Sequence, residues 1–270
     1  MVSFKKVFDF YIRSSIHVAL SVYALVRMTH FMFDISDDQA IASFAFFGTI
    51  VGYNFVKYDT LARFQKNKMR NELKIISALS LFSLVGVGYY FFQLQSITQL
   101  VSVGVLALTL LYTLPFFPNR KNARNWAGVK IYIVALCWVG VTLVLPLVNA
   151  GISLGLDFYL KFVQRFILVF VLILIFEIID LANDDPHLQT VPQQIGVKKT
   201  KIVGLLLLIP FYLLEFFKTN FIEKQLIVNL VLVVVLSLFL IFANEKRSRY
   251  YTSFWVESIP VFWWLMVVFY

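Results

Sequence analysis

Long apolar segments alternate with short polar ones along the whole chain. A helix that crosses the hydrocarbon core of a bilayer needs about 20 predominantly apolar residues. Nine segments are long enough, covering about 8–29, 38–57, 74–94, 97–115, 128–149, 158–180, 201–217, 225–243 and 253–270. This pattern predicts an all-α fold in which a bundle of about nine transmembrane helices makes up a polytopic membrane protein.

The composition excludes an ordinary water-soluble domain. Hydrophobic residues make up 60% of the 270 positions and charged residues 14%, whereas soluble domains have about 25% charged residues. A net charge of +9 is compatible with nucleic-acid binding, but the basic residues lie in short loops between apolar segments. That placement is the orientation signal of a membrane protein. We therefore expect a lipid bilayer as partner and no nucleic acid.

The charged loops also predict the topology. Lys and Arg concentrate at the N-terminus and in the even-numbered loops, while the odd-numbered loops are poor in basic residues. By the positive-inside rule, the N-terminus and even loops are cytoplasmic and the C-terminus is outside. We expect one transmembrane domain over 1–270, with like halves of about 1–126 and 127–243 and an added ninth helix, in a bacterial cytoplasmic membrane.

Three carboxylates mark the end of the sixth predicted helix, in the stretch FEIIDLANDD. Glu177, Asp180 and Asp184 are spaced so that they share one helical face. Like charges this close repel, and a divalent ion with oxygen ligands, such as Mg²⁺, resolves the repulsion. The alternative is a solvated helix end whose carboxylates pair with Lys198 or Lys199.

The second predicted helix ends with polar residues on the same side of the membrane. Its last residues, GYNFVKYD, place Asn54, Lys57, Tyr58 and Asp59 at one depth. An Asn near a helix end is often only a hydrogen-bonding residue between helices. The parallel with the sixth helix nevertheless suggests that both helix ends contribute to one site.

Other ionisable residues inside the spans allow several interpretations. Arg13, His17 and Ser21 recur every four residues, and this stripe either lines a cavity or faces another helix. Glu257 is expected to face the bundle, where it could pair with a basic group.

Asp157, Lys161 and Arg165 are also spaced by four residues, at the other end of the sixth predicted helix. This spacing brings side chains together on a helix surface. We interpret the three residues as a structural, self-paired ladder.

The acidic motif and the segment after it resemble the UbiA family of intramembrane prenyltransferases. In that family a D-x-x-x-D motif precedes T-x-P, a Gly and basic residues. The corresponding residues in DLANDDPHLQTVPQQIGVKKTK are Asp180, Asp184, Thr190, Pro192, Gly196, Lys198 and Lys199. The nine-helix layout with a polar cytoplasmic mouth is similar as well, so the resemblance covers essentially the whole chain.

The resemblance implies transfer of a prenyl group from a polyprenyl diphosphate to an acceptor that is often aromatic, with Mg²⁺ as cofactor. Asp180 and Asp184 would hold one ion, and Asn54, with Asp59, another. The basic residues expected to neutralise the departing diphosphate are Lys57, Arg63, Lys121, Lys130, Lys198 and Lys199. The apolar bundle would hold the prenyl tail away from water.

The first motif of the chain departs from the family pattern. The family has N-D-x-x-D-x-x-x-D, and the acidic positions after Asn54 are here Phe55, Tyr58 and Ala62, with Asp59 one place off. This departure leaves two alternatives beside the enzyme: a degenerate family member that binds without catalysis, or a small-molecule or ion transporter.

Overall fold

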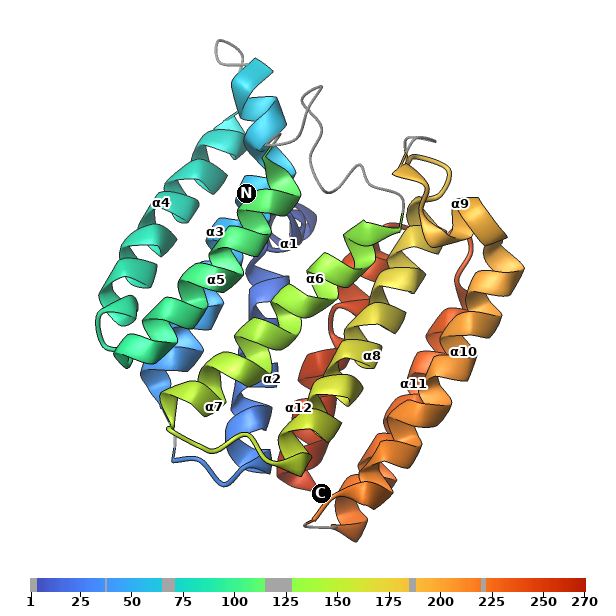
Figure 1. Cartoon of the computed structure of the whole chain (residues 1–270). Coiled ribbons are helices and arrows are strands. Elements are labelled where there is room, and N and C mark those ends of the chain that lie inside the picture. Colours follow the sequence, from blue (N-terminus) through green and yellow to red (C-terminus); the bar gives the residue numbers. More distant parts are fainter. Residues whose placement is uncertain (1–3, 37, 65–70, 115–127, 185–187, 220–221) are drawn as a thin grey trace.

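A computed structural model describes residues 4–36, 38–64, 71–114, 128–184, 188–219 and 222–270, with the backbone only for 59–64. Figure 1 shows these residues as a bundle of long, roughly aligned helices. In chain order the elements are α1 (Phe4–Arg13), α2 (Ile16–Met32), α3 (Gln39–Phe64), α4 (Asn71–Phe91), α5 (Ser96–Thr113), α6 (Val129–Val139), the π-helical turn η3 (Gly140–Val144), α7 (Leu145–Asn149), α8 (Leu156–Asp180), α9 (Val191–Ile195), α10 (Val197–Leu213), the 3₁₀ turn η5 (Leu214–Phe217), α11 (Glu223–Phe242), the π-helical turn η6 (Tyr251–Val256) and α12 (Ile259–Phe269).

The described residues contain eight helical segments that are long and apolar enough to cross a membrane. They match the second to ninth predicted spans. In two of them a π-helical turn precedes a proline, Pro146 in α7 and Pro260 in α12. Proline lacks the N–H of the regular helical ladder, and a wider turn accommodates that loss within the span. The prediction of an all-α, multi-pass membrane bundle is confirmed.

The first predicted span, 8–29, is wrong as a single helix. The chain breaks at Ser15, whose φ of 64° ends α1, and the apolar helix α2 that follows has 17 residues. Polar side chains of α3 bind the carbonyls freed by the break. Asn54 Nδ2 donates to the Ser14 carbonyl at 3.1 Å and the Tyr58 hydroxyl to the Arg13 carbonyl at 2.9 Å. Long-range contacts therefore stabilise this break.

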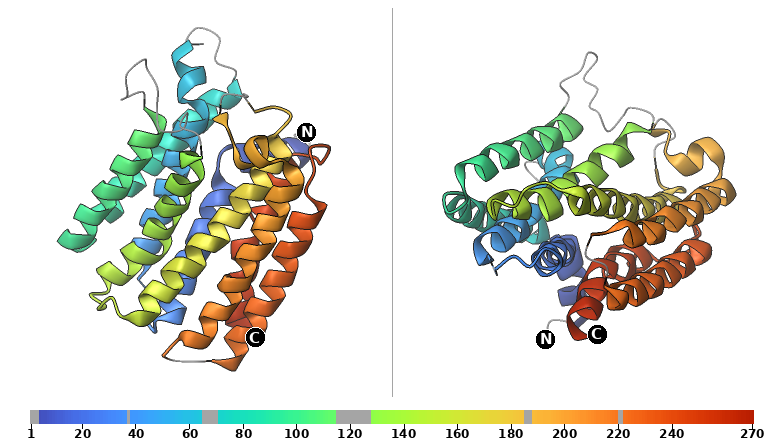
Figure 2. Two further views of the ribbon diagram at one scale, coloured as in Figure 1. Left: turned by 45° about the vertical axis from the view of Figure 1, so that its right-hand side comes forward. Right: turned by 60° about the horizontal axis from the view of Figure 1, so that its bottom comes forward.

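Helix α1 docks on the loop that precedes η6. The Tyr250 hydroxyl donates a hydrogen bond to the Asp9 carboxylate, and Arg249 pairs with the same group at 3.3 Å. The hydrogen bond from Tyr250 and the charge of Arg249 hold the pKa of Asp9 below its ordinary value. Helix α1 and the loop before η6 thus meet at one end of the bundle, whereas the C-terminus lies at the other end, as the left view of Figure 2 shows.

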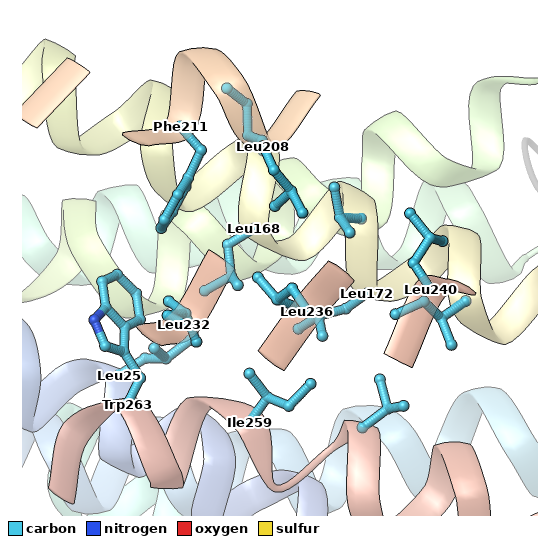
Figure 3. Packing of buried hydrophobic residues seen from close by; sticks show 14 of the residues in the cluster. Leu25, Leu168, Leu172, Leu208, Phe211, Leu232, Leu236, Leu240, Ile259 and Trp263 are labelled. Carbon is cyan, nitrogen blue, oxygen red and sulfur yellow. The ribbon is translucent and has the colours of Figure 1, made fainter. Parts of the chain in front are cut away.

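The main core lies where α2, α8, α10, α11 and α12 meet (Figure 3). Leu25, Leu168, Leu236 and Trp263 are almost fully buried there. Helix α8 is the most enclosed span, with 67% of its apolar window buried, whereas α4 has 11%. Because lipid tails are as apolar as leucine, the exposed Leu, Phe and Val side chains of α4 carry no penalty.

The predicted self-paired ladder on α8 is wrong. Lys161 forms an ion pair with Glu215 of η5 at 2.8 Å, and Arg165 donates to the Leu25 carbonyl at 3.2 Å and to Thr142 at 3.0 Å. The third member, Asp157, accepts a hydrogen bond from the Thr219 amide at 2.8 Å. Each of the three side chains contacts a different segment of the chain. They therefore connect α8 to other elements and do not pair with one another.

Glu215 is the centre of this polar cluster. It is fully buried and also pairs with Lys218 at 2.8 Å. Its Oε2 accepts hydrogen bonds from Asn229 at 2.9 Å and Gln164 at 3.0 Å. One carboxylate therefore compensates two buried ammonium groups.

We predict that Glu215→Gln lowers the free energy of unfolding by about 3–5 kcal/mol, because it leaves Lys161 and Lys218 without a counter-charge in an apolar surrounding. Unfolding of purified protein by titration with a denaturing detergent measures the change. The control Glu223→Gln, at an exposed carboxylate at the start of α11, should change stability by less than about 0.5 kcal/mol. Equal stability of the two variants would contradict the assignment.

Candidate functional site

A cavity of about 210 Å³ opens between α3, α6, α8 and the junction of η6 with α12. Its apolar walls are formed by Val134, Trp138, Val169, Leu172, Ile173, Phe176, Val256 and Pro260. Its polar lining consists of Tyr53, Lys130, Glu177, Asp180, Asp184 and Glu257. An apolar chamber with a few polar groups is typical of a small-molecule binding site.

The three carboxylates predicted to share a face do line one cavity. Helix α8 ends at Asp180, but one further turn follows, in which the Asp184 amide donates to the Asp180 carbonyl at 2.9 Å. This bond keeps the helical spacing between the two aspartates. Local sequence spacing was therefore sufficient to predict that these side chains lie together.

Glu177 has a different role from the two aspartates. It is buried, and its Oε2 accepts a hydrogen bond from the Val191 amide at 3.0 Å, at the first residue of α9. Gly196, with φ of 81°, ends α9 and starts α10 in a conformation that favours glycine. Glu177 thus holds the segment after the acidic motif against α8.

Asp180 and Asp184 are the groups that could hold a cation. Asp180 is exposed to the cavity mouth, and Asp184 Oδ2 is a buried oxygen with no hydrogen-bond partner among the described residues. Those residues contain no cluster of three or more His, Cys, Asp or Glu side chains that could hold a metal ion. Mg²⁺ is commonly bound by one or two carboxylates together with substrate phosphates, so this donor pair fits Mg²⁺ with a phosphate-bearing ligand.

Lys130, at the start of α6, is the one basic residue that lines the cavity in the described part of the chain. It lies on the wall formed by α6, beside the acidic end of α8. Lys198 and Lys199 are exposed at the start of α10 and form no ion pair with Asp180 or Asp184 within the described ranges. The alternative interpretation was a solvated helix end at which these lysines neutralise the aspartates. No ion pair among the described residues supports it.

The polar end of α3 lies beside the α1–α2 break. Asn54 Nδ2 donates to Ser80 at 2.9 Å as well as to the Ser14 carbonyl, and Lys57 Nζ donates to Ser15 at 3.1 Å. Neither Asn54 nor Lys57 is among the residues that line the cavity. Asn54 Oδ1 is buried without a described partner. The predicted metal and diphosphate roles of these two residues stay predictions.

Three predicted site residues lie outside the described residues. For Asp59 and Arg63 this applies to the side chains, and for Lys121 to the whole residue. Their predicted roles at the metal and diphosphate are not tested.

Tyr53 and Trp138 are cavity residues that the sequence analysis missed. Trp138 Nε1 donates a hydrogen bond to the Tyr53 hydroxyl at 2.7 Å, joining α6 to α3 across the cavity. With aromatic residues at 17% of the chain, no local signal distinguished these two rings from packing residues. Only the approach of two distant helices identifies them.

The stripe on the first predicted helix faces another helix rather than the cavity. His17 Nε2 donates to the Phe254 carbonyl at 2.9 Å, so its Nδ1 accepts the hydroxyl of Tyr11 at 2.7 Å. Ser21 donates to the Glu257 carbonyl. Arg13 pairs with Glu72 of α4 at 3.0 Å. The stripe therefore anchors η6 and α4, which decides between the two alternatives.

Comparison with solved structures identifies the fold. The chain is similar to a structure described as digeranylgeranylglyceryl phosphate synthase in membranes, with a TM-score of 0.57 and 13% sequence identity over 98% of this chain and 96% of the other. The chain has a UbiA-type fold. This confirms the fold that the acidic motif suggested. No protein-family model and no curated protein matches the sequence.

We predict that Glu177→Ala speeds hydrogen exchange at the Val191 amide about 10- to 100-fold. The amide loses a charge-assisted hydrogen bond of about 1.5–3 kcal/mol, and the α9 segment opens more often. Exchange measured by mass spectrometry on peptides covering 188–196 tests this. Lys198→Ala, at an exposed side chain of the next helix, serves as control, and unchanged exchange in Glu177→Ala would contradict the anchoring role.

Proposed function

We propose that the chain is an intramembrane prenyltransferase that moves a prenyl group from a polyprenyl diphosphate to an aromatic or lipid acceptor with Mg²⁺. The observation that carries the proposal is the position of Asp180, Asp184 and Lys130 at the polar end of an apolar cavity. The UbiA-type fold supports it, because the cavity and its motif lie in the fold of a membrane prenyltransferase.

In this proposal each wall of the cavity acts on one part of the donor. Asp180 and Asp184 would hold Mg²⁺, which would supply positive charge against the diphosphate. Lys130, beside these carboxylates at the start of α6, adds a positive charge. The aromatic faces of Tyr53 and Trp138 stabilise positive charge on the allylic carbon, and the apolar side chains of α6 and α8 surround the tail and exclude water.

We also propose roles for the other residues that the resemblance to the UbiA family singled out. Asn54 and Asp59 would hold a second ion, and Lys57, Arg63, Lys121, Lys198 and Lys199 would attract the diphosphate from the cytoplasmic side. We also propose that the N-terminus is cytoplasmic, so that soluble diphosphate-bearing groups reach the cavity mouth. Glycosylation or cysteine-labelling scanning of the loops tests this orientation.

We predict that Asp180→Asn and Asp184→Asn each lower turnover at least about 10²-fold, since each removes a charge that holds the metal–diphosphate complex. Purified protein with Mg²⁺ and a radiolabelled prenyl diphosphate is scored for release of diphosphate and for labelled product. Glu245→Gln, at an exposed carboxylate in the loop before η6, should retain wild-type activity. Full activity of Asp180→Asn would overturn the mechanism, and donor binding without turnover in the wild type would favour the non-catalytic alternative.

We predict that Lys130→Met raises the KM for the prenyl diphosphate and lowers kcat by about 10- to 100-fold, while Lys130→Arg retains most activity. The reason is that the positive charge contributes both to donor binding and to stabilisation of the leaving diphosphate. Steady-state kinetics with varied donor concentration separate the two effects. Equal kinetics of the Met and Arg variants would exclude an electrostatic role.

A further inference from the structure

Glu257 is a carboxylate in the same cavity that the proposed donor site does not use. It follows η6 and lies two residues before α12 begins, and its side chain lines the cavity together with Asp180 and Asp184. Among the described residues its carboxylate accepts no hydrogen bond and forms no ion pair. Lys57 attracts it electrostatically from α3. Because an ionisable residue inside a span is costly, it requires a functional explanation.

The backbone around Glu257 is held firmly by another helix. Its amide donates to the Thr252 carbonyl at 3.0 Å, the wide spacing of a π-helical turn, and its carbonyl accepts the hydroxyl of Ser21. One turn earlier, the Phe254 carbonyl accepts both His17 Nε2 at 2.9 Å and the Ser258 hydroxyl at 2.7 Å. The polar stripe of α2 therefore fixes the turn that carries Glu257, and such π-helical turns are frequent at functional sites.

Glu257 is not a third ligand of the proposed ion. The described residues contain no cluster in which three acidic side chains could share a metal, so Glu257 lines the cavity apart from the Asp180–Asp184 pair. Because none of the described residues donates a hydrogen bond to the Glu257 carboxylate, which lies beside apolar walls, its oxygens are available to a bound molecule. A general base needs this arrangement, because it must reach the proton that it removes.

We propose that Glu257 is the general base for the acceptor, and that the acceptor reacts through a hydroxyl group, as a lipid alcohol or a phenol. This inference rests on the proposed prenyl transfer. In the step, the bond from the allylic carbon to the diphosphate oxygen breaks and both electrons leave with the diphosphate. The acceptor oxygen forms the new bond to that carbon, and its proton moves to the Glu257 carboxylate.

The test compares two probe acceptors that differ in acidity, with geranylgeranyl diphosphate as donor. One probe is oleyl alcohol and the other is 4-nonylphenol. Phenols ionise near pH 10, as tyrosine does, whereas an aliphatic hydroxyl is far less acidic and depends more on a base. We expect Glu257→Gln to lower the rate of transfer to oleyl alcohol about 10²- to 10⁴-fold. The factor by which it lowers the rate of transfer to 4-nonylphenol should be at least ten times smaller.

Two further measurements separate a base from a structural residue. Glu257→Asp should recover part of the transfer to oleyl alcohol, and Glu257→Gln should bind the donor with wild-type affinity. Glu245→Gln is the matched control and should behave as the wild type with both probes. An equal loss with both probes, or no loss, would overturn the role of Glu257 while leaving prenyl transfer intact. Absence of transfer in the wild-type protein would instead overturn the proposed function, and this inference with it.

Discussion

A charged side chain inside a lipid bilayer must meet another polar group, and the arrangement of this bundle follows from how its two ends satisfy that constraint. At one end, Glu215 compensates Lys161 and Lys218, and Asn229 and Gln164 occupy its remaining lone pairs. That cluster connects α8, η5 and α11 through the four donors that reach the Glu215 carboxylate. It fixes helices that would otherwise be held only by apolar packing.

At the other end the carboxylates are left incompletely satisfied. Asp184 Oδ2 is buried without a described partner, and the Glu257 side chain lines the same cavity. Buried polar atoms without partners are uncommon and require an explanation. In our proposal a diphosphate–metal complex satisfies the aspartates and an acceptor hydroxyl satisfies Glu257. The two ends differ in that the Glu215 carboxylate is paired with two lysines, whereas the carboxylates of Asp180, Asp184 and Glu257 line a cavity.

Helix α8 couples the two ends. It carries Lys161 and Arg165 near its beginning and Glu177 and Asp180 at its end, and it is the most enclosed span of the bundle. Its buried contacts to α2, α10 and α12 hold the acidic end in place relative to η6. Side chains from other helices bind carbonyls at the break at Ser15 and at the turn η6. Irregular backbone therefore occurs where protein side chains satisfy it, as expected in a membrane.

The sequence alone determined the membrane class, nearly all span boundaries and the placement of Glu177, Asp180 and Asp184 together, because apolar run length and helical spacing are local properties. It could not determine the break at Ser15, the partners of Lys161 and Arg165, or the pairing of Tyr53 with Trp138. Each of these depends on a contact between helices far apart in the chain. Glu257 shows the difference most clearly. The sequence indicated an acid that faces the bundle. Only the packing of η6 against α2 placed it in the cavity that Asp180 lines. The reason is that the pairing of helix faces is a property of the whole fold.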